Sequence, residues 1–156
     1  MKIIGLILSI LMLCSSIFAQ EAQITDEIGD ITCDDYLLRM YNVNFGLIND
    51  LTSKVYILIY EGKEWRYNAK KDKTESVLPA YGSAKARIRS IKQYFKTYKQ
   101  EDLLQRIVFV EAGFRENFAV EFWFAPNGAS APKPTPTLTK MKYRKGKPKE
   151  FCVICC

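Results

Sequence analysis

The stretch KVYILIYEG, residues 54–62, decides the fold of this chain. All residues from 55 to 60 are apolar or aromatic, so a strand formed here has two apolar faces. Such a strand lies inside a sheet with both faces covered, because either face would otherwise expose large side chains to water. The apolar run ends at Tyr60, and Gly62 follows two residues later. We therefore predict that this segment is the central strand of a sheet.

Helical segments follow and precede this strand. SAKARIRSIKQYFKTYKQ, residues 83–100, has apolar residues at steps of four, three, four and three, and Ser83 is a suitable N-terminal cap. CDDYLLRMYNVNFGLIND, residues 33–50, follows the capping residue Thr32 and has two aspartates in its first turn, where they favour the helix dipole. The predicted buried face of this helix consists of Leu37, Met40, Tyr41, Phe45 and Ile48.

Two further strands are predicted after the second helix. RIVFVE, residues 106–111, and NFAVEFWF, residues 117–124, are joined as a hairpin by AGFR, in which Gly113 supplies a permissive backbone. In 117–124 every second residue is large and apolar, which fits a half-buried antiparallel strand. Residues 21–25, EAQIT, are a candidate for a further edge strand.

Strand, helix and strand in this order imply a right-handed crossover, which places residues 55–60 and 106–111 in parallel. The hairpin then adds an antiparallel partner to the sheet. The predicted fold class is therefore α/β, or α+β, with a small mixed sheet and two helices packed on it. We expect one domain over residues 20–125.

Residues 63–82, KEWRYNAKKDKTESVLPAYG, lack clean periodicity and are predicted to form a long loop. This loop follows the carboxyl end of the central strand, which is a common ligand position. Trp65, Tyr67 and Tyr81 stand among basic residues, an arrangement that suits a ring or a sugar next to an anion. The alternative is that these rings only fold the loop onto the sheet edge.

The start of the chain indicates export. Residues 1–19 combine Lys2 with an apolar run that ends before the polar QEAQITDE, the pattern of a secretory signal peptide cleaved after Ala19. Lipid attachment at Cys14 is the minor alternative, because the residue before it is the bulky Leu13. No later apolar run approaches the ~20 residues of a membrane-spanning helix. We expect an exported protein, periplasmic or extracellular.

Four cysteines remain after this cleavage, namely Cys33, Cys152, Cys155 and Cys156. In an oxidising compartment they predict disulfides, and a bond from Cys33 to Cys152 or Cys155 would contribute ~4 kcal/mol on the chain-entropy model. A thiolate metal site and a redox-active pair are the alternatives, but Cys33 is alone and CVIC ends the chain. Residues 126–156 are proline-rich and basic, which predicts an extended linker, or a strap across the domain if the cysteines pair.

Charge is distributed unevenly along the chain. Residues 20–61 contain eight acidic and two basic residues, whereas residues 62–156 contain nine acidic and twenty basic ones. Outside the cytoplasm, a basic field favours lipid headgroups, wall polymers or acidic proteins as partners. Export and the lack of a recognition motif argue against nucleic acid.

Residues that carry catalysis are scarce. The chain has no histidine, which removes histidine-based catalysis and histidine metal ligands. Glu111 and Glu116 are a candidate acid/base pair, but the favoured interpretation is that they are solvated turn residues. We therefore expect a protein that is not an enzyme and that uses no metal or cofactor.

The order of these segments resembles that of the OmpA-like peptidoglycan-binding domain over about residues 23–124. That family has a helix, a strand ending in G-H-T-D, a helix with the pattern L-S-x-x-R-A-x-x-V-x-x-Y-L, a strand beginning R-[IV], a G-[YF]-G-E turn and a closing strand. SAKARIRSIKQYF places Arg87 at the family's helix arginine, and QRIVFVEAGFRE matches at Arg106, Gly113 and Glu116. The resemblance implies that Arg87 contacts the carboxylate of the wall peptide's diaminopimelate.

The chain departs from the family at the G-H-T-D aspartate, which holds the diaminopimelate amine, because YEGKEW stands there instead. The candidate ligand-binding residues are therefore Arg87, Glu61 or Asp72 as a substitute carboxylate, and Trp65 and Arg66. By spacing alone Arg87 is a solvated helix residue. We expect a non-enzymatic binding module of the cell envelope that contacts peptidoglycan or another anionic polymer. The rival hypothesis is a protein-interaction domain with a decayed ligand pocket.

Overall fold

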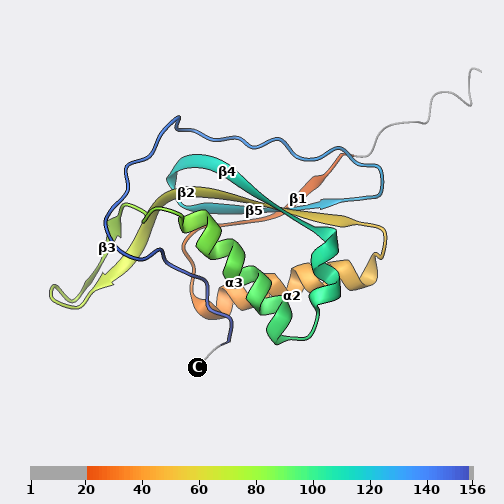
Figure 1. The fold of residues 1–156 in the computed structure, drawn as a ribbon, viewed down its shortest axis with the longest axis horizontal. Coiled ribbons are helices and arrows are strands. Elements are labelled where there is room, and N and C mark those ends of the chain that lie inside the picture. Colours follow the sequence, from red (N-terminus) through yellow and green to blue (C-terminus); the bar gives the residue numbers. More distant parts are fainter. Residues whose placement is uncertain (1–20, 155–156) are drawn as a thin grey trace, which may run out of the picture.

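The computed structural model describes residues 21–154 and shows one mixed sheet with two long helices on one face (Figure 1). In chain order its elements are β1 (Gln23–Ile28), α2 (Cys33–Asn49), β2 (Lys54–Asn68), β3 (Lys73–Val77), α3 (Ser83–Thr97), a 3-10 helix (Glu101–Arg106), β4 (Ile107–Asn117) and β5 (Ala119–Ala125). The predicted fold class is confirmed. The predicted signal peptide, Cys14 and the last two cysteines lie outside the described residues. Within 21–154 no helix has the length and apolarity to cross a membrane.

β2 is the central strand, as its apolar sequence predicts. It pairs in parallel with β4, with Val55 opposite Ile107, and antiparallel with β5 over residues 54–60. β1 extends the sheet by pairing antiparallel with β5. Side chains of β2 alternate between two apolar clusters, so that Ile57 faces the helices while Leu58 faces the opposite side, both fully buried. The parallel crossover and the edge strand expected from EAQIT are both confirmed.

The connection between β4 and β5 differs from the predicted hairpin. Only Phe118 separates the two strands, yet within the described sheet each pairs with β2 and not with the other. The chain crosses over β2 at Gly62, where an added Cβ would overlap the backbone of Asn117 and Phe118. Because a Cβ points out of the plane of a sheet, only glycine leaves room for this crossing. The Phe118 N–H then donates to the Lys63 carbonyl at 3.0 Å.

Residues 63–82 do not form the predicted loop. β2 continues through this region to Asn68, and β3 pairs with it antiparallel from Glu64 opposite Val77 to Asn68 opposite Lys73. The resulting hairpin projects from the end of the sheet (Figure 1). Both faces of this hairpin carry charged or exposed side chains. Its two strands therefore show no apolar alternation by which they could be predicted from the sequence.

α2 begins at its predicted cap, because the Thr32 hydroxyl accepts the Asp35 N–H at 3.3 Å. Its buried face agrees with the predicted one at Met40, which is fully buried, and at Leu37, which packs against the core, but Tyr41, Phe45 and Ile48 are more than half exposed. The residues that α2 buries are Tyr36, Met40, Val43, Asn44 and Leu47. The sequence pattern was ambiguous because α2 carries apolar residues on two faces.

The segment of residues 126–154, here named the strap, runs back across the domain (Figure 1, blue). On the sheet face opposite the helices, the Thr135 N–H donates to the Tyr60 hydroxyl at 3.0 Å. The strap then rounds the end of the sheet and joins the helix side, where Cys152 forms a disulfide with Cys33. One of the two predicted pairings of Cys33 is thus present. Of the two predicted forms of this segment, a free linker and a strap across the domain, the structure has the strap.

We expect Gly62→Ala to lower the free energy of unfolding by about 3 kcal/mol, because the new methyl group overlaps backbone that cannot move aside. Gly29→Ala is the matched control, since its Cβ would meet only the Phe118 carbonyl at 3.6 Å, and it should change stability by no more than about 1 kcal/mol. Urea denaturation measures both variants. Equal stability of the two would contradict the crossing.

Candidate functional site

Arg87 is enclosed in the protein, with 1% of its surface exposed. Its Nη2 atom lies 3.4 Å from Glu64 Oε1 and 3.6 Å from Asp30 Oδ1. The guanidinium lies 3.9 Å from the ring centroid of Phe118 and 4.4 Å from that of Phe151. The expectation of a solvated helix arginine is therefore wrong. The reason is that this side of α3 faces the base of the hairpin and is covered by the strap.

The two carboxylates around Arg87 are held by donors from other segments. Asp30, in the connection from β1 to α2, accepts the Trp65 N–H at 2.7 Å and the Lys149 ammonium at 2.6 Å. Glu64 accepts the Ser83 hydroxyl at 2.7 Å. Burial lowers the pKa of Arg87, and the carboxylates oppose this by favouring the charged form. The guanidinium thus has its counter-ions within the chain.

Glu61 has a structural role at the start of α3. Gly82 precedes this helix and offers no side-chain cap, and Ser83, the predicted cap, binds Glu64 instead. Glu61 Oε1 accepts the Ala84 N–H at 2.8 Å, so a carboxylate from β2 satisfies the helix N-terminus. Glu61 Oε2 accepts the Tyr143 hydroxyl at 2.6 Å. Burial and this hydrogen bond raise the pKa of Tyr143.

A cavity of about 280 Å³ lies beside Glu61, where the middle parts of β2 and β4 meet the start of α3. Ile59 and Phe114 give it apolar walls, and Glu111 and Lys85 line it as exposed charged residues. Both oxygens of Glu61 already accept hydrogen bonds from the protein. The two exposed charged residues of this cavity, Glu111 and Lys85, carry opposite charges. The cavity therefore specifies no single class of ligand.

The other predicted site residues are only partly brought together. Asp72 lies at the tip of the hairpin and accepts the Tyr67 hydroxyl, whereas Arg87 lies at the hairpin's base, so the two do not meet. Trp65 is half exposed, and Arg66 donates to the Lys147 carbonyl at 3.5 Å. Asp30 and Glu64 were not among the predicted site residues. No sequence signal identified them, because the need for carboxylates arises only from the burial of Arg87.

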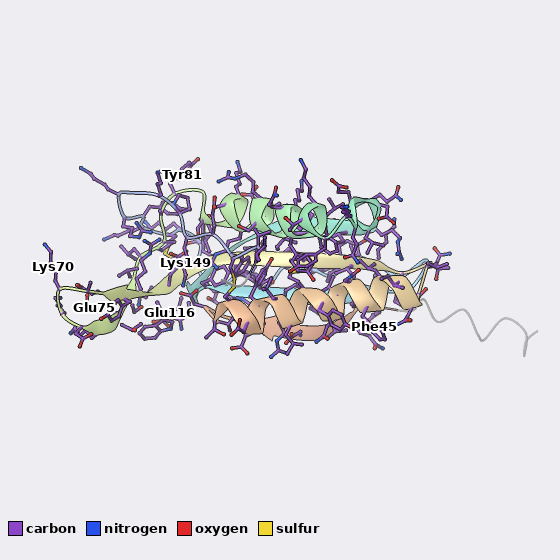
Figure 2. All side chains as sticks on the ribbon, turned by 90° about the horizontal axis from the view of Figure 1, so that it is seen from below. Phe45, Lys70, Glu75, Tyr81, Glu116 and Lys149 are labelled. Atoms are coloured by element: carbon purple, nitrogen blue, oxygen red, sulfur yellow. A yellow bond between two sulfur atoms is a disulfide. The ribbon has the colours of Figure 1, made fainter. Side chains whose placement is uncertain are left out.

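Two basic segments that are distant in the sequence lie side by side. Arg144 forms a backbone bridge with Ala80, and its N–H donates to the Pro79 carbonyl at 3.0 Å. We name residues 63–85 and 140–149 together the basic end. They contain twelve basic and three acidic residues, whereas the remainder of the chain contains eleven basic and fourteen acidic ones. Figure 2 shows Lys70 and Tyr81 at this end of the molecule and Phe45 toward the other.

Aromatic rings accompany these charges. Four of the exposed large apolar residues of the structure belong to the basic end, namely Trp65, Tyr67, Tyr81 and Tyr143. Tyr81 and Tyr143 meet edge to face, with centroids 5.4 Å apart. Exposed rings between cations suit a partner that combines flat or sugar-like surfaces with negative charge.

Glu111 and Glu116, the candidate acid/base pair, have separate surroundings in the structure. Glu116 forms an exposed ion pair with Lys63 at 3.4 Å, and Glu111 lines the cavity near Glu61. No group of three or more acidic or cysteine side chains within 21–154 is arranged to hold a metal ion. In comparisons with protein-family models, curated proteins and solved structures, nothing matched the chain.

Replacing Arg87 should affect stability, because it removes the buried counter-ion of Glu64 and leaves Asp30 with Lys149 alone. We expect Arg87→Met to lower the free energy of unfolding by about 3–5 kcal/mol. Arg89→Met is the control, since its exposed pair with Glu150 contributes no more than about 1 kcal/mol. Adding Glu64→Gln to Arg87→Met should recover part of the loss. Chemical denaturation of the three variants gives the answer, and an unchanged stability of Arg87→Met would exclude this role.

Proposed function

We propose that this protein is an exported binding module that contacts an anionic polymer of the cell envelope through its basic end. The observation that carries this proposal is that two basic segments, residues 63–85 of the hairpin region and residues 140–149 of the strap, lie side by side. In the sequence 54 residues separate them. Their pairing through Arg144 and the Pro79 carbonyl makes one continuous surface of them.

The distribution of charge favours the basic end over the other surfaces as the binding site. By the counts given above, the basic end has a net charge of +9 and the remaining residues −3 at pH 7. Fields from such a concentration of charge extend over about 8 Å at physiological ionic strength and attract polyanions. The exposed rings of Trp65 and Tyr81 can stack on sugars between the charged contacts.

The disulfide between Cys33 and Cys152 supports export, because such bonds persist in oxidising compartments. A kinship with the OmpA-like domain remains part of this proposal, and it would concern the fold more than the ligand site. In that family the helix arginine contacts the wall peptide. The enclosure of Arg87 by Phe118 and Phe151 favours a different mode here, in which the polymer contacts the surface and Arg87 only stabilises the fold.

The second candidate function is a protein-interaction domain whose ligand pocket has decayed. One observation favours it specifically: Phe151 and Lys149 of the strap occupy the surroundings of Arg87 that a small ligand would need. Its partner would be an acidic protein surface, because the same basic end is exposed in either case.

Removing charge from the strap should weaken binding to the polymer. We expect the triple variant Lys142→Gln, Lys145→Gln and Lys147→Gln to bind purified, anionic wall material at least tenfold more weakly, because each lysine near a polyanion contributes about 1 kcal/mol. Co-sedimentation at low and at physiological salt measures this affinity.

The matched control removes the same charge elsewhere. Lys54, Lys96 and Lys99 are exposed and lie outside the basic end, so their replacement by glutamine should weaken binding less than threefold. Equal loss in both triple variants would indicate only a general charge effect and would contradict the proposed surface. No sedimentation of the intact protein with wall material at low salt would exclude the polymer and leave the acidic protein partner.

A further inference from the structure

α2 has an apolar stripe on the side that faces away from the sheet. Its members are more than half exposed, from 51% to 77%, and they continue past the end of the helix. The stripe consists of Leu38, Tyr41, Phe45, Ile48 and Leu51. Figure 2 shows Phe45 on this helix, at a distance from the labelled residues of the basic end. Isolated apolar residues are normal on a protein surface, but a contiguous group of five marks an interaction site.

The spacing of the stripe is that of a helix–helix seam. Leu38, Tyr41, Phe45 and Ile48 follow one another at steps of three, four and three, the repeat by which one helix packs against another in a coiled coil. Arg39 is the one charged residue between Leu38 and Ile48, and it pairs with Asp26 of β1 at 3.1 Å. A partner for the stripe is therefore a helix that carries apolar residues at the same spacing.

We propose that this partner is a second copy of the chain, so that two α2 helices pack antiparallel in a symmetric dimer. Steps of three, four and three are the same in both directions. A two-fold axis near position 43 thus places Leu38 opposite the second copy's Ile48, and Tyr41 opposite its Phe45. Each of these four apolar residues meets an apolar residue, as the self-complementary interface of a two-fold dimer requires, and Leu51 lies one turn beyond them.

The position of the basic end favours the antiparallel arrangement over the parallel one. α2 begins next to the basic end, because Asp30 just before it binds Lys149 at 2.6 Å and Cys33 is bonded to Cys152. A parallel pair would bring two such ends, each strongly positive, side by side. The antiparallel pair places them at opposite ends of the dimer, where their repulsion is smallest.

The available area fits a dimer of moderate affinity. Five large side chains that are about half exposed offer roughly 100 Å² each, which gives about 1,000 Å² for two copies, the lower limit for a specific interface. A cavity of about 360 Å³ between α2 and β1 opens beside Phe45 and can receive a ring of the second copy. We expect a dissociation constant on the order of 10 μM.

This dimer goes beyond the proposed function and does not depend on it. It would give the protein two basic ends that face in opposite directions. If the basic end binds a polymer, the dimer can hold two strands at once or bind one strand with increased avidity.

Sedimentation equilibrium of the exported protein from about 1 to 300 μM, at physiological salt, tests the proposal. We expect a reversible monomer–dimer equilibrium, and a monomer at all concentrations for Phe45→Glu. Tyr81→Glu is the matched control, because it adds the same charge and removes an exposed ring at the basic end, and it should leave dimerisation unchanged. A thermal melt of each variant checks that it is folded.

A charge exchange tests the direction of the helices. Leu38→Lys and Ile48→Glu, each alone, should weaken the dimer at least tenfold. The double variant should recover most of this loss, because in an antiparallel pair the lysine of one copy faces the glutamate of the other. In a parallel pair like charges would meet and no recovery would occur.

Two results would overturn the dimer: an intact protein that stays monomeric at the highest concentration, or a Phe45→Glu variant that associates like the intact protein. The first would assign the stripe to a different partner. A double variant that shows no recovery would overturn the antiparallel arrangement.

Discussion

The buried ion pairs of Arg87 with Asp30 and Glu64 connect segments that are far apart in the sequence. Through them the start of α2, the base of the hairpin and α3 meet at one point, and Lys149 and Phe151 of the strap close it. A buried charge without a counter-ion is too costly to persist, so the positions of these elements are mutually dependent. The rest of the architecture is arranged around this constraint.

The strap connects the buried ion pairs to the basic end, because it contributes residues to both. The end of the strap is held by the disulfide and by stacking of Phe151 on Tyr36, with ring centroids 4.2 Å apart. Its basic residues therefore cannot move away from the hairpin. A field that a free tail would spread through solvent is therefore concentrated at one end of the molecule. The same contacts cover Arg87, so the cations of the proposed binding surface are exposed lysines, whereas the buried arginine stabilises the fold.

Prediction from sequence succeeded where the pattern was local and unambiguous. The apolar run of β2, the cap and acidic first turn of α2, and the periodicity of α3 each depend on residues within one element. Three of its failures concern the arrangement of the elements. α2 carries apolar residues on two faces, β2 extends past Gly62 through a charged segment, and the crossing of the chain over Gly62 replaces a hairpin. In each case the missing information lay in another element.

Local sequence was thus sufficient for the central strand, the two helices, their parallel crossover and the pairing capacity of the cysteines, because hydrophobic periodicity and compartment govern these features. The tertiary structure alone decided that Arg87 is internal, that Glu61 caps α3, and that residues 63–85 and 140–149 form one surface. The physical reason is that burial and electrostatic pairing depend on distances between residues that the chain separates by tens of positions. No local pattern contains those distances.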